Sequence, residues 1–153
     1  MTIQTFLTQL CEHCGLQTDV VTYTEKQVEK TKEITLSVPD EDSGLFIGFH
    51  GETLESLQRL VRIIFQETAD EKIMLNINDY RQQRAERLQE MTKSAVDRVL
   101  AGESVFTFHS YLPSYERFII HSALAELPEA VELKSVSVGE GRDRRLQIQR
   151  KQA

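Results

Sequence analysis

The sequence has little cysteine, no long apolar run and no basic segment at its start. Cys11 and Cys14 are its 2 cysteines, too few for a disulfide framework, and they fit a reducing compartment. Uninterrupted apolar runs are short, as at residues 63–65, so no segment is expected to span a bilayer. Because no basic cluster precedes the first apolar residues, we expect no secretory signal. These absences predict a soluble cytoplasmic protein.

The patterns that mark common enzyme classes are also missing. We find no catalytic serine–histidine–aspartate pattern, phosphate-binding Walker loop, dinucleotide-binding glycine fingerprint or catalytic pair of carboxylates. Cys11 and Cys14 have the spacing of half a zinc site, but no second pair of thiols accompanies them. The acidic residues 40–42 lack the spacing of a calcium loop, so a solvated turn is expected there. We therefore expect no enzymatic activity, no metal and no cofactor.

Positive charge is scarce in the first half of the chain. The net charge over 153 residues is −6. Residues 1–80 hold 6 Lys and Arg against 14 Asp and Glu, whereas residues 81–153 hold 12 against 10. From Lys134 onward the count is 6 against 2. Any contact with a polyanion is therefore expected in the C-terminal half, where counterion release favours binding.

Apolar periodicity predicts a first module with the order helix, strand, strand, turn, helix, strand. Its predicted elements are a helix at Ile3–His13, strands at Asp19–Thr24 and Glu33–Val38, a helix from Thr53 onward, and a strand at Lys72–Ile77. A charged segment at residues 25–32 is expected to join the first two strands. The second helix is strongly amphipathic, and the apolar residues predicted to lie on one stripe of it are Leu54, Leu57, Leu60, Val61, Ile64 and Phe65.

The remaining pattern predicts a second module with the order helix, strand, helix, strand, strand. Its predicted elements are a helix at Tyr80–Leu100, a strand at Ser104–His109, a helix from Ser114 to about Leu127, and strands at Val131–Val138 and Arg145–Gln149. The turn sequence at residues 139–143 predicts that the last two strands form a hairpin. The predicted fold class is thus α+β, with two small modules in tandem at residues 1–79 and 80–150.

The first module contains a GxxG motif between two helical segments. Glycines have no Cβ, so the backbone can approach a sugar–phosphate chain closely, and the next helix directs its free N–H groups and positive dipole end there. KH domains use such a loop to clamp about four nucleotides beside an apolar groove. GxxG alone is also common as a simple turn, but the order of the surrounding elements favours a type II KH domain. The predicted contacts are Ile47, Gly48, Phe49, His50 and Gly51.

The second module contains an Arg and a His four residues apart. This spacing places Arg117 and His121 on one face of a helix. A guanidinium can bind a phosphate through two hydrogen bonds or stack on a base, and an imidazole can stack or donate a hydrogen bond. Of the three apolar residues between them, some must face the core. In the alternative, purely structural interpretation, Arg117 pairs with Glu116 or Glu140 and His121 is a partly buried helix residue.

In this order the motifs resemble the Jag (KhpB) family of bacterial RNA-binding proteins. In that family a KH domain precedes an R-three-H domain, named for an Arg and a His separated by three residues. The resemblance covers roughly residues 1–150 and rests on residues 44–65, 76–91 and 112–145. It implies binding of single-stranded RNA, with single-stranded DNA as an alternative ligand, and post-transcriptional control of growth or division genes. It also implies association with a small KH-only protein, or self-association, and no membrane.

The resemblance assigns roles to particular residues. Gly48 and Gly51 match the clamp glycines, and Arg117 and His121 match the pair that names the second domain. The glycine-acid-glycine turn at residues 139–141 and the arginines after it match a hairpin of the family. In this hairpin the predicted RNA contacts are Arg142, Arg144 and Arg145.

The chain departs from the family pattern in two motifs, and each departure loses a cation. The family usually has Lys or Arg between the clamp glycines, where this chain has Phe49 and His50, and commonly has a second arginine where it has Phe118. Phe49 offers a base-stacking face worth about 1–3 kcal/mol, and His50 is cationic only when protonated. Together with the acidic first half, this predicts a weak KH module and a leading R-three-H module. The alternative function is a protein-interaction adaptor whose KH fold no longer binds nucleic acid.

Overall fold

The computed structural model describes residues 1–152 and divides the chain into two compact units. The first unit runs from Met1 to Arg81, and the second starts at Gln82. Within the described part of the chain, no helix combines the length and apolar composition needed to cross a membrane. The predicted α+β class with two modules in tandem is confirmed.

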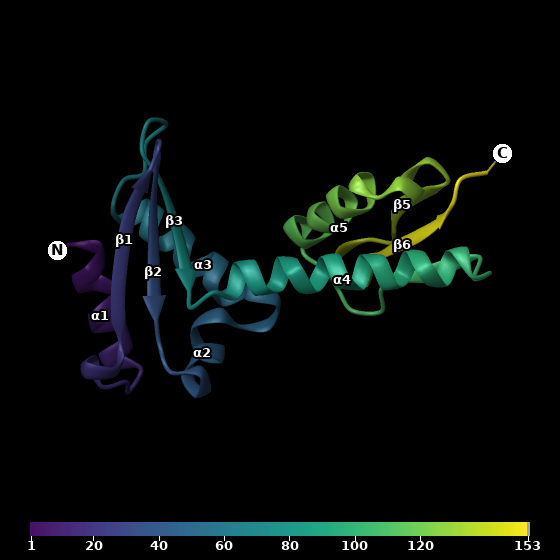
Figure 1. Ribbon diagram of the computed structural model, residues 1–153. Helices are drawn as coiled ribbons and strands as arrows, with labels where there is room; N and C mark the ends of the chain where they lie inside the picture. Colours follow the sequence, from purple (N-terminus) through teal and green to yellow (C-terminus); the bar gives the residue numbers. More distant parts are fainter. Residues whose placement is uncertain (153) are drawn as a thin grey trace. The chain divides into compact units, whose positions relative to one another are not determined.

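The first unit is a three-stranded sheet with helices on one face (Figure 1). Its elements are α1 (Ile3–His13), β1 (Thr22–Val28), β2 (Thr31–Ser37), α2 (Asp40–Ile47), α3 (Glu52–Ile64) and β3 (Lys72–Ile77). The strand order is β1-β2-β3, with β1 antiparallel and β3 parallel to the central strand. Leu36 of β2 and Leu75 of β3 are buried with Leu7 of α1 and Val61 of α3. The core of this unit therefore lies between the helices and one face of the sheet.

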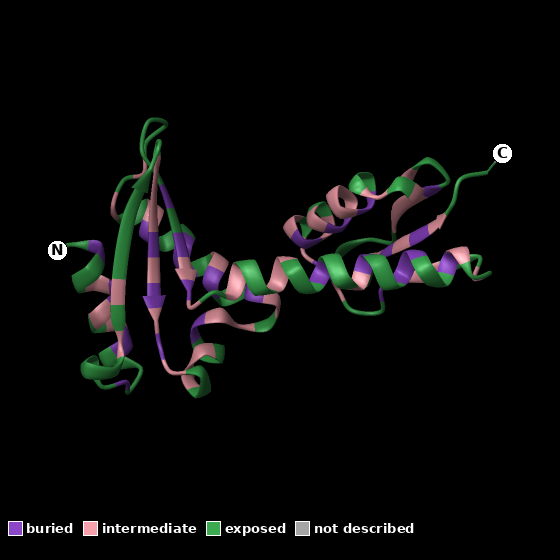
Figure 2. Ribbon diagram, in the orientation of Figure 1, coloured by how far each residue is buried: buried purple, intermediate pink, exposed green. Residues whose placement is uncertain are grey.

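The charged segment at residues 25–32, predicted as a connection, is mostly strand. Only Glu29 and Lys30 lie between β1 and β2, and Glu29 has φ 53°. β1 also starts later than predicted, because Thr18–Val20 form a 3-10 turn. Apart from Tyr23, every residue of β1 is exposed (Figure 2). The prediction was wrong here because an edge strand that is exposed on both faces lacks apolar alternation.

The acidic turn predicted at residues 40–42 is the first turn of α2. Its three carboxylates lie at the helix N-terminus, where the positive end of the helix dipole favours them. α2 has 8 residues, of which only Phe46 is buried, so its sequence has little apolar periodicity. This short helix was therefore missed, and the order of the first module is helix, strand, strand, helix, helix, strand.

α3 buries only part of its predicted apolar stripe. Leu54, Leu57 and Val61 are buried, whereas Leu60 and Ile64 are 51% and 47% exposed. Gln58, a polar residue of the same helix, is buried instead. Its burial is possible because its side-chain oxygen accepts a hydrogen bond from the Leu75 amide at 2.9 Å. The predicted apolar stripe is therefore only partly buried, and Leu60 and Ile64 leave apolar surface on this helix.

The second unit places two helices on a three-stranded antiparallel sheet. Its elements are α4 (Tyr80–Leu100), β4 (Val105–Thr107), α5 (Ser114–Glu126), β5 (Leu133–Val138) and β6 (Arg145–Arg150), and the first two residues of α4 belong to the first unit. The strand order is β4-β6-β5. Leu88 and Val99 of α4, Ile120 of α5, and Leu146 and Ile148 of β6 are almost completely buried in one core.

The second unit agrees with the prediction in the order of its elements and in the bounds of α4. β4 is shorter than the predicted Ser104–His109. β5 begins two residues later than predicted, because Pro128–Val131 form a 3-10 turn. β5 and β6 are the predicted hairpin, and the chain between them includes a second 3-10 turn at Gly141–Asp143.

Candidate nucleic-acid interface

Two glycines shape the connection between α2 and α3. Gly48 has φ 73° and ψ −177°, and a Cβ at this position would lie 2.1 Å from Thr53 Oγ1. No side chain fits there without moving the first turn of α3. Gly51 has φ 78° and precedes α3 without a side-chain cap. The helix therefore begins with amide groups that no capping side chain occupies, in the place that the GxxG motif predicts.

The tip of the clamp offers an aromatic ring instead of a cation. Phe49 is 62% exposed, and its ring meets the His50 ring edge to face with 4.1 Å between the centroids. His50 has left-handed backbone geometry, with φ 51°. Ile47 is half-buried and packs against the first core. Of the predicted contacts in this module, Phe49 presents the largest accessible apolar face.

The first turn of α3 carries two acidic residues, Glu52 and Glu55. Glu52 is exposed in its first turn, directly after the clamp. Glu55 pairs with Arg81, with 2.6 Å between the carboxylate and Nη1. Arg81 Nε also donates to the Leu75 carbonyl at 3.0 Å, so this arginine ties the start of α4 to β3 and α3. The clamp thus has the backbone shape for a phosphate but little positive charge to attract one.

An apolar groove lies beside the clamp, between α1, α2 and α3. It has a volume of about 230 Å³, and its lining residues are Leu10, Cys14, Leu45, Phe46, Thr53, Ser56, Leu57 and Leu60. Leu45 is 58% exposed and Leu60 is 51% exposed. The groove reaches Thr53, the residue that packs against Gly48. This surface can accept an apolar group from a ligand or a partner.

Arg117 and His121 lie one turn apart on α5, and each is oriented by a serine. Arg117 Nη2 donates to Ser114 Oγ at 3.0 Å, and Nη1 donates to the Leu112 carbonyl at 3.4 Å. His121 Nδ1 shares a hydrogen bond with Ser135 Oγ on β5. Burial, and secondarily the charge of Arg117, lower the pKa of His121 below its ordinary value. Both causes favour the neutral form of the His121 imidazole.

The structure does not support pairing of Arg117 with Glu116 or Glu140. Glu116 is fully buried and accepts two hydrogen bonds from Arg84 of α4, at 2.7 Å from Nε and 3.0 Å from Nη2. Within residues 1–152, Arg117 has no carboxylate partner. The guanidinium of Arg117 therefore keeps its charge uncompensated on the surface of α5.

The three arginines of the hairpin differ in position. Arg142 and Arg144 are exposed, whereas Arg145 is half-buried and its Nη1 donates to the carbonyls of both others, at 2.7 and 3.0 Å. Arg145 pairs with Val138 in the sheet, and Ser135 pairs with Ile148. Because strand side chains alternate, Arg145 lies on the opposite sheet face from Ser135, the partner of His121. Arg145 thus braces the turn instead of joining the α5 residues.

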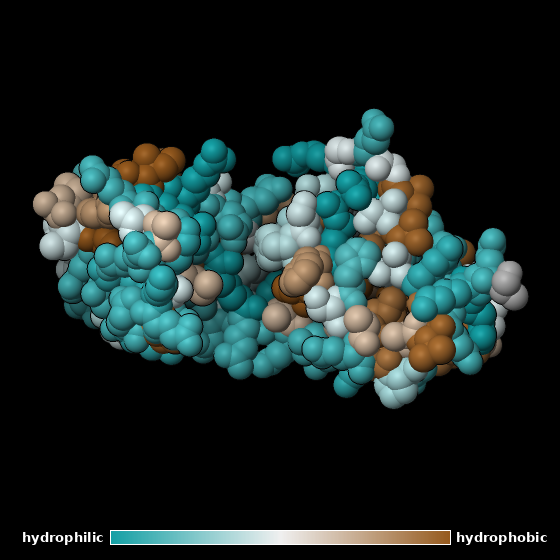
Figure 3. Space-filling view, turned by 90° about the horizontal axis from the view of Figure 1, so that it is seen from above, coloured by the Kyte–Doolittle hydropathy of each residue, from teal (hydrophilic) through white to brown (hydrophobic). Residues whose placement is uncertain are grey.

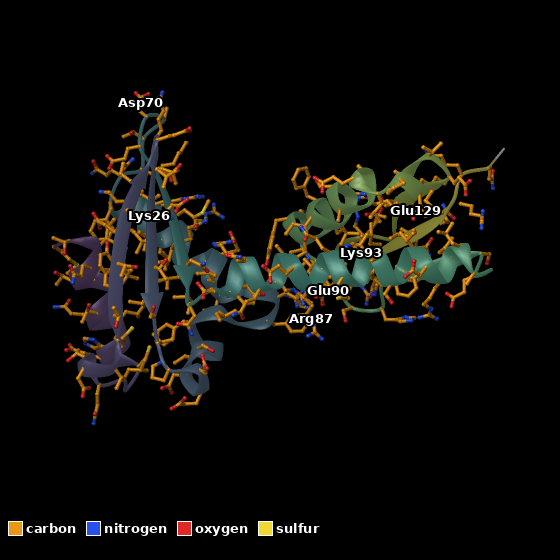
Figure 4. All side chains as sticks on the ribbon, in the orientation of Figure 1. Lys26, Asp70, Arg87, Glu90, Lys93 and Glu129 are labelled. Atoms are coloured by element: carbon orange, nitrogen blue, oxygen red, sulfur yellow. The ribbon has the colours of Figure 1, made fainter. Side chains whose placement is uncertain are left out.

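Elsewhere the exposed charges are of both signs. Arg87, Glu90 and Lys93 follow one another along the exposed side of α4 (Figure 4).

The pKa of the buried Cys11 thiol is raised to about 11 by burial, and secondarily by Cys14. In the described part of the chain, no three His, Cys, Asp or Glu side chains gather to hold a metal ion. The face drawn in Figure 3 is largely hydrophilic, with separate apolar patches.

Sequence reasoning missed three features of the α5 surface. The Ser114 partner of Arg117 has i,i+3 spacing and could have been inferred. Ser135 could not, because it is 14 residues from His121 and its strand is joined to α5 only by tertiary structure. Phe118 is 70% exposed, whereas Ile120 is buried. The sequence does not indicate which side of α5 faces the core, so the exposure of Phe118 could not be inferred from it.

Two family models match the chain. The KH domain of KhpA/KhpB matches residues 3–77, and the R-three-H domain matches residues 86–150. Neither is a catalytic domain, which agrees with the prediction that the chain is not an enzyme. The two matched segments correspond to the two modules that the elements form.

Curated relatives from three bacteria carry the name RNA-binding protein KhpB. The Clostridium symbiosum protein is 31% identical to this chain over 78% of the chain's length. The Bacillus subtilis protein is 29% identical over 80% of the chain's length. The Lactiplantibacillus plantarum protein is 35% identical over 60% of the chain's length. The matches span 53%, 59% and 29% of these relatives, respectively. The chain therefore contains a KH domain of the KhpA/KhpB family followed by an R-three-H domain, and it is similar over most of its length to proteins named RNA-binding protein KhpB.

Proposed function

We propose that this chain binds single-stranded RNA and that its second module makes the stronger contact. The observation that carries the proposal is the α5 surface, where serines orient Arg117 and His121 and no carboxylate of residues 1–152 neutralises Arg117. Exposed Arg142 and Arg144 extend the positive charge of this module. The relatives named RNA-binding protein KhpB support RNA as the ligand, with single-stranded DNA as the alternative.

In this proposal the KH module adds a weaker contact. The backbone at Gly48 and Gly51 holds a sugar–phosphate segment, and Phe49 stacks on a base. Glu52 and the excess of acids in residues 1–80 oppose phosphate binding. We expect the clamp to help position RNA whose affinity comes mainly from the second module.

We assign residues 1–79 to the KH domain and residues 80–150 to the R-three-H domain. We further propose that the protein acts in the bacterial cytoplasm as a post-transcriptional regulator, as the resemblance to the KhpB family implies. A small KH-only protein or a second copy of the chain is the expected protein partner.

The test is binding of a short unstructured RNA, measured by fluorescence anisotropy at several salt concentrations. Replacing Arg117 and Arg144 together by Ala should weaken binding about tenfold or more, since each removes a charge-assisted contact. The slope of log K against log salt should also fall by about 0.7 for each lost phosphate contact. Circular dichroism of the variant should match the wild type, because neither side chain is buried.

The matched control removes two cations from another surface. Arg87 and Lys93 are both exposed on α4, and their replacement by Ala changes the net charge equally. We expect this control to bind RNA nearly as well as the wild type. Equal affinity of the wild type and the Arg117→Ala, Arg144→Ala variant would remove the second module from the RNA site.

The groove beside the clamp favours a second candidate function, that of a protein-interaction adaptor. Its lining is almost entirely apolar, and the exposed Leu45 and Leu60 at its rim fit an apolar partner surface better than RNA. A mobility shift with pooled cellular RNA discriminates between the two functions. No shift at tens of micromolar protein, combined with self-association that Leu60→Glu abolishes, would favour the adaptor.

A further inference from the structure

Phe118 on α5 is the most exposed phenylalanine of the chain. It is 70% exposed, compared with 62% for Phe49. On α5 the buried side is occupied by Glu116, Ile120 and Leu124, so Phe118 projects from the opposite side of the helix. The ring therefore contributes little to the second core, and its position needs another explanation.

The neighbours of Phe118 on the helix surface are polar. At i−4, i−3, i+3 and i+4 these neighbours are Ser114, Tyr115, His121 and Ser122. A protein-docking site of ordinary size has further apolar residues around its anchor. An exposed ring whose helix neighbours are two serines, a histidine and a tyrosine instead fits a flat aromatic ligand with polar edges, such as an unpaired base.

Phe118 shares a helix face with the two residues proposed to bind RNA. At 100° per residue, Arg117, His121, Ser114 and Phe118 fall within a sector of about 100°. The Arg117 guanidinium donates a hydrogen bond to Ser114 in the first turn of α5. Ser114 is four residues before Phe118, so it lies next to Phe118 on the helix surface. A phosphate at Arg117 and a base on the Phe118 ring can therefore belong to one RNA segment.

We propose that Phe118 is a base-stacking residue, so that the RNA bound by Arg117 and His121 places one unpaired base on this ring. The inference rests on the proposed RNA binding and names the contact that supplements the phosphate contacts. Stacking on an aromatic ring is tolerant of base identity. It also depends weakly on salt, because it releases no counterion, whereas the Arg117 contact depends strongly on salt.

The experiment compares Phe118→Ala, Phe118→Leu and Phe118→Trp in the full chain, with a short single-stranded RNA as the probe. Ala and Leu should weaken binding about fivefold to a hundredfold without changing the salt slope, whereas Trp should retain affinity. The chain has no tryptophan, so Phe118→Trp introduces a single tryptophan whose emission reports on this position. Stacking with a base should quench its fluorescence as RNA is added.

The matched control is Val131→Ala, an apolar residue of the same module that is 79% exposed. It should bind RNA as the wild type does. Wild-type affinity of the Ala and Leu variants, with no quenching in the Trp variant, would overturn the role of Phe118 while the Arg117→Ala, Arg144→Ala result still supports RNA binding. Absence of RNA binding by the wild type would overturn the proposed function itself. Loss of a protein partner in the Ala variant, with RNA affinity unchanged, would reassign the ring to protein docking.

Discussion

The two modules present opposite combinations of shape and charge to a nucleic acid. The KH module has a clamp whose backbone is fixed by the close contact of Gly48 with Thr53, but residues 1–80 carry 14 acids against 6 bases. The R-three-H module has no such clamp in its α5 surface, but it orients Arg117 and His121 through serines. The comparison teaches that the backbone shape of the clamp does not depend on local positive charge, because the close contact of Gly48 with Thr53 is a packing feature.

The largest expected effect concerns the buried ion pair beneath the α5 surface. Glu116→Ala leaves Arg84 without its fully buried partner, so the free energy of unfolding of the second module should fall by about 3–5 kcal/mol. Denaturant unfolding, with hydrogen exchange of the α5 amides, measures the change. Lys26→Ala in the first module is the control, because its pair with Glu33 is exposed and should contribute below about 1 kcal/mol. A similar loss in both variants would contradict this view of the second module.

The next effect tests whether packing maintains the clamp. Gly48→Ala places a Cβ 2.1 Å from Thr53 Oγ1 at positive φ, so it should destabilise the first module by about 1–3 kcal/mol. Gly44→Ala in the preceding helix meets nothing within 4 Å and should be neutral or stabilising by up to about 1 kcal/mol. Urea midpoints of the two variants measure the difference. If the two midpoints coincide, the clamp geometry does not depend on Gly48.

A smaller effect should follow from restoring charge to the clamp. Phe49→Lys places a cation at an exposed position between the clamp glycines, so the salt slope of RNA binding should steepen by about 0.7. Anisotropy titrations at several salt concentrations measure the slope, and Leu45→Lys on the neighbouring α2 is the control. An unchanged slope would show that RNA does not approach the clamp. RNA binding would then be a property of the second module alone.

The smallest effect is the pH dependence that His121 confers. The pKa of His121 is lower in the folded chain than its unfolded value of about 6.5. When the pH falls below about 6.5, the unfolded state therefore binds the proton more strongly than the folded state does. The free energy of unfolding should therefore fall as the pH drops from 7 through the lowered pKa, and His121→Gln should reduce this dependence. Thermal melts between pH 7 and 5 compare the two proteins. An identical pH dependence in both would exclude a lowered His121 pKa.

Regular periodicity made much of the fold predictable. α1, α4 and β3 begin and end at the predicted residues, because each shows a clear apolar repeat. β1 was only partly predicted and α2 was missed, since an exposed edge strand and a helix with one buried residue have almost no such repeat. Tertiary contact, not local pattern, stabilises these two elements.

The candidate site was predictable only where it is local. The spacing of Arg117 and His121 places them on one helix face, and the GxxG motif marks the clamp. The Ser135 partner of His121 and the opposite sheet face of Arg145 depend on how β5 and β6 pair and pack. The exposure of Phe118 depends on which side of α5 meets the core. Both are properties of tertiary structure that a single sequence does not display.

Ultraviolet crosslinking of a short single-stranded RNA to the full chain, with the crosslinked residues identified by mass spectrometry, tests most directly which module leads. We predict that the strongest crosslinks occur on α5, at Phe118 or His121, with a weaker one at Phe49. Crosslinks confined to the clamp, or found on neither module, would contradict the account.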